Sequence, residues 1–381
     1  MAMSAPTSGY DHVDYDTLDS AKLAFIAASR KTLTFAKDFG FVADDKLGAS
    51  ANIFSLSLEP FIKQGLKEIQ VTLLPEGLGT ADDARPDDLT DSELESFWYN
   101  IGLKSVAVMT NDAATAGMQT ILVGMYLPSA DPERVFTKQF MKGFLAGFVD
   151  GCQQVGCVYL SGETPQLKNK IIPDKLDIAG ALFGVVPPGC EAIHSNNIQA
   201  GDYIILVESS GPHENGFTTL RALAEKTGYR AKLSDGTEFW HAMNRGSKLY
   251  TPLIQAILKQ GIFLSNAENI TGHGWQKIMR PLKPLRYQIE DFPPILPVFE
   301  FAKEQLGMSY TDLLSVFNCG SGLALFCRDR QSAEEIVSLA TSRQYKAVIA
   351  GQVSDSPTGI REVVVPKLGV TLSGEAFKLG K

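Results

Sequence analysis

The eight residues Ser209-Ser210-Gly211-Pro212-His213-Glu214-Asn215-Gly216 separate two segments of different character. Residues 203–208 before them have the composition of a buried strand, and residues 217–226 after them have the apolar spacing of a helix. Hydroxyls, glycines, a histidine and an amide between a strand and a helix favour a loop that binds phosphate or a polar substrate. The alternative is a long capped turn.

Working outward, strand-like and helix-like segments alternate in both halves, which predicts an α/β or α+β fold. The chain has 381 residues, which favours two domains. Pro187-Pro188-Gly189, with the polar stretch up to Gly201, is the expected boundary. The expected parts are an N-terminal arm and helix at 1–45, a domain at 46–188 and a domain at 201–367.

Composition narrows the class of protein. The formal charge is −8 and the pI about 5.3, which argues against general nucleic-acid or anionic-membrane binding. No apolar run approaches the roughly 18–20 residues of a membrane helix, and the polar start shows no secretion signal. Five cysteines, an odd count, favour reduced thiols in the cytoplasm over a disulfide framework.

Three loops of the first half carry an acid. Glu76 precedes the glycine turn Gly77-Leu78-Gly79-Thr80, Asp112 follows Asn111 after a strand expected at 105–111, and Glu163 lies between Gly162 and Thr164 after a strand expected at 158–160. Acids at strand ends suit Mg²⁺ bridging the phosphates of a nucleotide, with the glycines offering N–H groups. The alternatives are a plain glycine turn and helix capping by Asp112 and Thr164.

In the second half, Asn269 to Gly274 and Asn318 to Gly322 are further glycine-bearing loops. Ser209–Arg221 resembles the Ser-Ser-Gly-x-His-Ser-Asn-Gly loop of the phosphoribosylformylglycinamidine cyclo-ligase family, also called aminoimidazole ribonucleotide synthetase. Phe317–Gly322 is similar to that family's Phe-Asn-x-Gly-x-Gly. The other loops follow in the family's order and are shared with a wider superfamily of ATP-using enzymes.

The chain departs from the family pattern at several positions. Its first loop has Glu76 where the family has Asp, and Ala81 where the family has Lys. Gln166 replaces an acid, His273 stands in the glycine loop, and the Glu-Asn that follows that loop has become Gln276-Lys277.

The resemblance implies an ATP-dependent synthetase fold with an N-terminal dimerising sheet domain and a C-terminal α/β domain. It implies ATP-dependent ring closure of formylglycinamidine ribonucleotide in purine biosynthesis, by a cytoplasmic homodimer. Glu76, Asp112 and Glu163 would serve Mg-ATP, His213 and Asn215 would act in catalysis, and a further set would bind the nucleotide: Gly77, Gly79, Thr80, Asn111, Gly162, Thr164, Ser210, Thr271, Gly272 and Gly274. Two alternatives stay open: another ATP-dependent enzyme of the superfamily, and a non-catalytic ligand-binding descendant.

Overall fold

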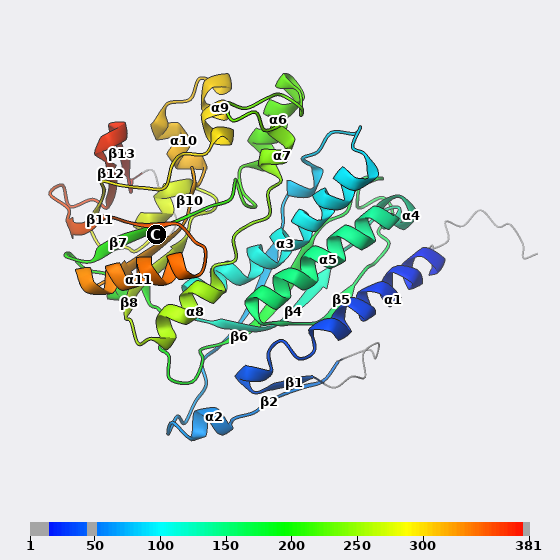
Figure 1. Ribbon diagram of the computed structural model, residues 1–381, viewed down its shortest axis with the longest axis horizontal. Coiled ribbons are helices and arrows are strands. Elements are labelled where there is room, and N and C mark those ends of the chain that lie inside the picture. The colour runs from blue at the N-terminus through cyan, green and yellow to red at the C-terminus, as the bar shows by residue number, and fades with distance from the viewer. Residues whose placement is uncertain (1–14, 44–51, 376–381) are drawn as a thin grey trace, which may run out of the picture.

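The computed structural model describes residues 15–43 and 52–375. The polar arm expected before residue 15 and the domain start expected at residue 46 lie outside the described residues. The chain forms two large sheets, one from each half, with helices packed on both (Figure 1). The mixed α/β class and the two-domain architecture expected from the sequence are therefore confirmed, while the proposed boundaries remain predictions.

The N-terminal sheet has four strands in the order β3 (Val71–Gly77), β6 (Ala179–Val185), β4 (Gln119–Tyr126) and β5 (Val158–Glu163). Strands β4 and β5 are parallel, and the other pairs are antiparallel. The first strand was expected to end at residue 74, but its pairing with β6 continues through Pro75, Glu76 and Gly77. Glu76 is therefore a strand residue, held in register by its neighbour.

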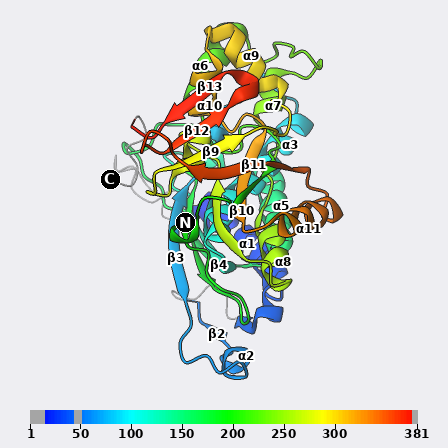
Figure 2. The ribbon, with the colours of Figure 1, turned by 90° about the vertical axis from the view of Figure 1, so that its left-hand side faces the viewer.

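Helices cover one face of this sheet (Figure 1). They are α3 (Asp91–Thr115), α5 (Lys138–Val155) and α1 (Tyr15–Thr32), with α1 packed on α5 and β5. The opposite face carries β1 (Phe41–Ala43), β2 (Phe54–Leu56) and α2 (Glu59–Ile62), as Figure 2 shows below β3. The short elements α4 (Pro132–Val135), η1 (Lys37–Phe39) and η2 (Ala81–Asp83) complete this half.

The strand expected at 105–111 is wrong, because these residues form the second half of α3. The helix starts at a capping box in which Thr90 and Glu93 satisfy each other's backbone N–H groups. It then continues for 25 residues, so the weak alternation at 105–111 reflects a helix that is buried on more than one side. Asn111 and Asp112 consequently lie in the helix, not after a strand.

Close packing of α3 on α5 explains the glycines of α5, as the sequence predicted. A Cβ on Gly143 would lie 2.2 Å from the carbonyl oxygen of Glu95, and a Cβ on Gly147 would lie 1.9 Å from that of Tyr99. From the other side, a Cβ on Gly102 would lie 2.3 Å from the carbonyl oxygen of Phe144. The two backbones approach so closely that only glycine fits.

The C-terminal half forms a seven-stranded sheet in the order β13-β12-β9-β11-β7-β10-β8. The strands are β7 (Tyr203–Glu208), β8 (Leu264–Asn269), β9 (Leu285–Ile289), β10 (Ser321–Cys327), β11 (Ala347–Asp355), β12 (Glu362–Val365) and β13 (Val370–Ser373). The helices are α6 (Phe217–Thr227), α7 (Phe239–Met243), α8 (Thr251–Lys259), α9 (Pro297–Leu306), α10 (Tyr310–Val316) and α11 (Arg330–Ser342). Short 3-10 turns are η3 (Ser195–Asn197), η4 (Gly274–Met279) and η5 (Pro366–Leu368).

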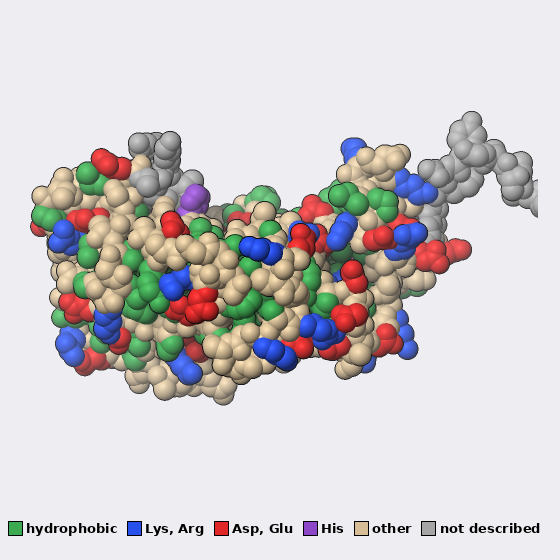
Figure 3. Space-filling model, turned by 90° about the horizontal axis from the view of Figure 1, so that it is seen from above, with side chains coloured by type: hydrophobic (Ala, Val, Ile, Leu, Met, Phe, Trp, Pro, Cys, Tyr) green, Lys and Arg blue, Asp and Glu red, His purple; other side chains and the backbone are tan. Residues whose placement is uncertain are grey.

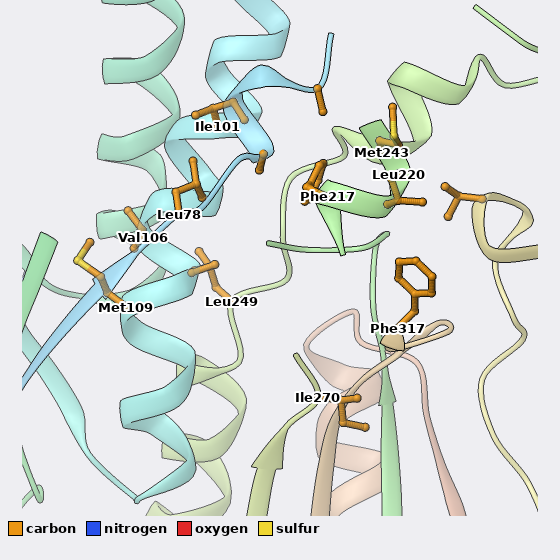
Figure 4. Packing of buried hydrophobic residues seen from close by; sticks show 14 of the residues in the cluster. Leu78, Ile101, Val106, Met109, Phe217, Leu220, Met243, Leu249, Ile270 and Phe317 are labelled. Atoms are coloured by element: carbon orange, nitrogen blue, oxygen red, sulfur yellow. The ribbon is translucent and has the colours of Figure 1, made fainter. Parts of the chain in front are cut away.

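One hydrophobic core runs through both halves. It includes Leu182 of the first sheet, Leu206 of the second, and α3 residues between them. Figure 4 shows side chains of α3, the Leu78 turn and the loops around Phe217 and Phe317 converging there. Helices α8 and α11 cover the other face of the second sheet.

The surface shown in Figure 3 carries acidic and basic side chains side by side. Among the described helices, none is both long and apolar enough to cross a membrane. The five cysteines are free thiols, and four of them are buried.

Replacing Gly147 with Ala should destabilise the protein. Helix propensity alone would favour Ala by about 1 kcal/mol, but the clash with the Tyr99 carbonyl should outweigh this and cost about 1–3 kcal/mol. Urea unfolding measures the difference. Gly77→Ala is the control, because its Cβ would meet nothing closer than 4.0 Å; stabilisation by Gly147→Ala would contradict the tight helix pair.

Candidate active site

The two motifs that carried the family resemblance form one structural unit. The Ser209 N–H donates to the Gly320 carbonyl at 2.8 Å, and the Ser209 hydroxyl donates to Asn318 Oδ1 at 2.9 Å. Asn318 Nδ2 in turn donates to the Gly211 carbonyl at 3.0 Å. The loop at 209–216 is therefore fixed to the turn that precedes β10.

Two glycines of these motifs serve packing. Gly216 has φ +77°, and a Cβ there would lie 2.2 Å from the Phe317 ring. Gly274 has φ +52°, and its Cβ would lie 2.3 Å from the Leu314 carbonyl oxygen. Gly272 differs, because the nearest atom to its Cβ position is Asn215 Oδ1 at 3.6 Å. Asn215 and Gly272 thus face each other across the two loops, as expected for residues of one site.

His213, which the family resemblance assigned to catalysis, is completely buried. Its Nε2 accepts from the backbone N–H groups of Ser210 at 3.3 Å and Lys248 at 3.4 Å. Burial, reinforced by the charges of Lys104 and Lys248, lowers the pKa of His213 to about 3. The imidazole is therefore a neutral acceptor that shapes the loop.

A buried lysine and glutamate lie beside this histidine. Lys104 of α3 donates its Nζ to the His213 carbonyl and lies over the Phe217 ring at 5.1 Å. Glu214 accepts from the Ser247 hydroxyl. Burial raises the pKa of Glu214 and lowers the pKa of Lys104, and the attraction between the two charges opposes both shifts. The pair ties α3 to the loop at 209–216.

A second polar group, the acidic cluster, consists of Glu76, Asp112, Glu268 and Lys277. Asn269 Nδ2 donates to Asp112 Oδ1 at 2.6 Å, which joins β8 to α3. Burial raises the pKa of Glu76, the Asp112 charge adds to this, and Lys277 opposes it. Burial likewise raises the pKa of Glu268 to about 7, although Arg280 lies 3.7 Å away.

Glu163 does not join this cluster. Glu76 belongs to a cross-strand row that ends at Gly162 on β5, and two strands lie between β5 and β3. Glu163 is the next residue, so it projects from the opposite face of the sheet, and its carboxylate accepts from the Thr164 N–H at 3.2 Å. Within the described ranges, no group of three or more His, Cys, Asp or Glu side chains could hold a metal ion. The three acids therefore do not converge as the sequence led us to expect.

Some of the remaining predicted residues support the fold through hydrogen bonds, and others have no neighbour or partner at their side-chain position. Asn111 is buried, donates to the Lys248 carbonyl and accepts from the Tyr250 N–H, so its amide is fully used. Ser210 donates to the Gly246 carbonyl. Open positions are Gly79, whose Cβ position meets nothing within 4 Å, and the Thr80 side chain, which makes no cap hydrogen bond. The Thr164 hydroxyl is buried with no hydrogen-bond partner.

Three residues of the candidate site were not predicted from the sequence: Lys104, Glu268 and Lys277. Lys104 and Glu268 lie inside regular elements that carry no motif. Lys277 had a signal, since it is one of the departures from the family pattern, but its charge interactions with Glu76 of β3 and Asp112 of α3 could not be inferred from sequence spacing.

Two sheets share one core, and glycine loops and acidic side chains meet at their junction. Residues 88–186 match the model of the family "AIR synthase related protein, N-terminal domain". A phosphoribosylformylglycinamidine cyclo-ligase of Synechocystis sp. is 30% identical over 61% of this chain and 69% of its own length. One from Bifidobacterium longum subsp. infantis is 27% identical over 79% and 85%.

The chain belongs to this phosphoribosylformylglycinamidine cyclo-ligase family of ATP-dependent enzymes, as a diverged member. Among solved structures, a hydrogenase maturation protein HypE in complex with ATP has the same fold, with a TM-score of 0.62. It is 13% identical, over 96% of this chain and 95% of that one.

In His213→Gln, the free energy of unfolding should depend less on pH below pH 6.5 than it does in the wild type. The unfolded imidazole, with a pKa near 6.5, binds a proton below that pH, while the folded one stays neutral down to about pH 3. Wild-type stability should therefore fall, relative to the variant, by about 1.4 kcal/mol per pH unit below pH 6.5. Urea unfolding at pH 4.5–7.5 measures this, with the exposed His241→Gln as control. Parallel wild-type and His213→Gln curves would contradict a buried neutral imidazole.

Proposed function

We propose that the protein catalyses the ATP-dependent cyclisation of formylglycinamidine ribonucleotide to aminoimidazole ribonucleotide in purine biosynthesis. The observation that supports this most is the union of the loops at 209–216 and 317–322, the two family-specific motifs, beside the loop at 271–274. In the proposed reaction, ATP transfers its terminal phosphoryl group to the formyl amide oxygen. A nitrogen of the same substrate then attacks that carbon, and the C–O bond breaks as phosphate leaves.

The residues fit this assignment by position and charge. Asn215 and Gly272 form the facing loop surfaces where substrate and phosphates would be oriented. Glu76 and Asp112 offer hard oxygen ligands, and Asn269 Oδ1 is buried with no hydrogen-bond partner. Two carboxylates with phosphate oxygens suit Mg²⁺, which prefers a partly protein-made shell. When bound with ATP, the ion would neutralise phosphate charge; the protein residues hold and orient the nucleotide.

A different ATP-dependent activity of the same superfamily is the second candidate. It is favoured by the loss of a charged residue at Ala81, which is fully buried among apolar residues. Two basic residues that could replace that charge make other contacts: Lys104 donates to the His213 carbonyl, and Arg85 lies over the rings of Phe97 and Trp98 at 5.4 and 5.1 Å. A changed phosphate environment would suit another acceptor.

One assay separates the candidates. ADP release should depend on formylglycinamidine ribonucleotide, and Asp112→Asn should weaken Mg-ATP binding about tenfold, because one charge interaction of about 1.4 kcal/mol is lost. The fold should persist, since an Asn oxygen can still accept from Asn269. Asp91→Asn, an exposed acid of the same helix, is the control. ADP release without that substrate supports the second candidate, and nucleotide binding without turnover supports a non-catalytic descendant.

We also propose a cytoplasmic homodimer that is formed through the N-terminal sheet. Leu73 and Val71 of β3 are 75% and 53% exposed, and Tyr126 of β4 is 42% exposed. Their register places them on the face opposite α3, beside the part of that face where Phe54 of β2 packs on Phe183. β3 is also an edge strand, which Figure 2 shows at the rim of the molecule. An exposed apolar face of this kind is typical of a subunit interface.

Leu73→Asp should convert the dimer to a monomer, because it places a charge in the apolar interface. Sedimentation velocity at micromolar concentration measures the change. Leu282→Asp, at an equally exposed leucine of the C-terminal half, is the matched control and should remain dimeric. A wild-type monomer, or an unaffected variant, would contradict this interface.

A further inference from the structure

Lys277 places an ammonium group inside the acidic cluster. The residue belongs to η4, directly after the loop at 271–274, and only 8% of its surface is exposed. Its Nζ donates to the Thr271 hydroxyl. The charges of Asp112, Glu268 and Glu76 all interact with it, although these three acids come from α3, β8 and β3.

The cluster needs this charge. Glu76 and Asp112 repel each other, and both lie where solvent screening is reduced. Arg280 lies 3.7 Å from Glu268 but its side chain is half exposed. Lys277 instead interacts with both Glu76 and Asp112 from a buried position. Its ammonium therefore has the neutralising role that a divalent cation could otherwise take.

The cluster also has unused hydrogen-bonding capacity. Asn269 Oδ1 is buried and has no partner, although the other end of the same amide is held by Asp112. A buried acceptor without a donor is costly, so it indicates a place for a bound cation or donor. This acceptor, Thr271 and Lys277 belong to the C-terminal half of the chain, whereas Glu76 and Asp112 belong to the N-terminal half.

We propose that Lys277 is the internal counter-ion of Glu76 and Asp112 and the phosphate-binding lysine of this site. The inference rests on the proposed ATP-dependent function for its phosphate part. In the protein without nucleotide, the ammonium neutralises the two carboxylates. With Mg-ATP bound, Glu76 and Asp112 would hold the ion, and Lys277 would be released to donate to phosphate oxygens. The positive charge absent at Ala81 would thereby be supplied by η4 of the C-terminal half.

The counter-ion role is tested without nucleotide. Mn²⁺ binding, followed by the electron paramagnetic resonance signal of the free ion, should be weak in the wild type. It should become about tenfold tighter in Lys277→Met, since removing one adjacent charge changes affinity on this scale. The double variant Lys277→Met/Asp112→Asn should lose the gain. Lys367→Met, which removes an ion-paired surface lysine, should behave as the wild type. Equal Mn²⁺ affinity in the wild type and Lys277→Met would overturn this role.

The phosphate role is tested by calorimetric titration with Mg-ATP in the Asp112→Asn background, where Lys277→Met brings no gain in metal affinity. In that background Lys277→Met should bind about tenfold more weakly than Asp112→Asn alone, Lys277→Arg should retain most of the affinity, and Lys367→Met should be unchanged. Unaltered Mg-ATP affinity on adding Lys277→Met overturns the phosphate role. If the wild type binds no Mg-ATP at all, the proposed function fails together with the phosphate role, and the Mn²⁺ result alone decides the counter-ion role. Circular dichroism confirms that each variant is folded.

Discussion

The double hydrogen bond of the Asn111 amide to the backbone at 248–250 is the constraint on which the site depends. It fastens α3, the helix that covers the first sheet, to the segment that leads into α8 of the second half. The amide is buried, so water cannot replace either bond without cost. Because Asp112 is the next residue, the same attachment fixes where its carboxylate meets Asn269. A helix turn that holds the two sheets together therefore also presents an acid at their junction.

Charge balance is the second constraint at that junction. Glu214 and Lys104 neutralise each other beneath the loop at 209–216, and Lys277 faces Glu76 and Asp112. Each group alone would be expensive to bury, because an unpaired charge is poorly solvated in the protein interior. Both pairs join elements from different halves of the chain. Displacing one half relative to the other would leave buried charges unpaired, which holds the two sheets in one arrangement.

Helices and strands that have their own sequence signal were predicted well, whereas contacts between distant parts of the chain were predicted poorly. The strand at 203–208 and the helix at 217–226 were confirmed as β7 and α6, because each has its own apolar pattern. Residues 105–111 were assigned wrongly because a helix buried on several sides loses its 3.6-residue pattern, whereas the capping box at Thr90 gave a usable signal. The three acids were grouped by their positions at strand ends, but the strand order puts two strands between Glu163 and Glu76. Spacing along a chain does not encode strand order.

Some residues of the motifs hold the loops in shape and others face the candidate site, and the sequence alone does not distinguish the two kinds. In the loop at 209–216, His213 accepts two backbone N–H groups and Gly216 makes room for Phe317, while Asn215 is left facing Gly272. A neutral imidazole whose pKa lies far below 7 and whose Nε2 already accepts two backbone N–H groups is not available as a general base near neutral pH. The proposed reaction does not require one for its first step, since phosphoryl transfer depends mainly on positioning and charge neutralisation. The chemistry therefore rests on the charges that surround the phosphates, and these are the groups that α3, β3 and η4 bring together.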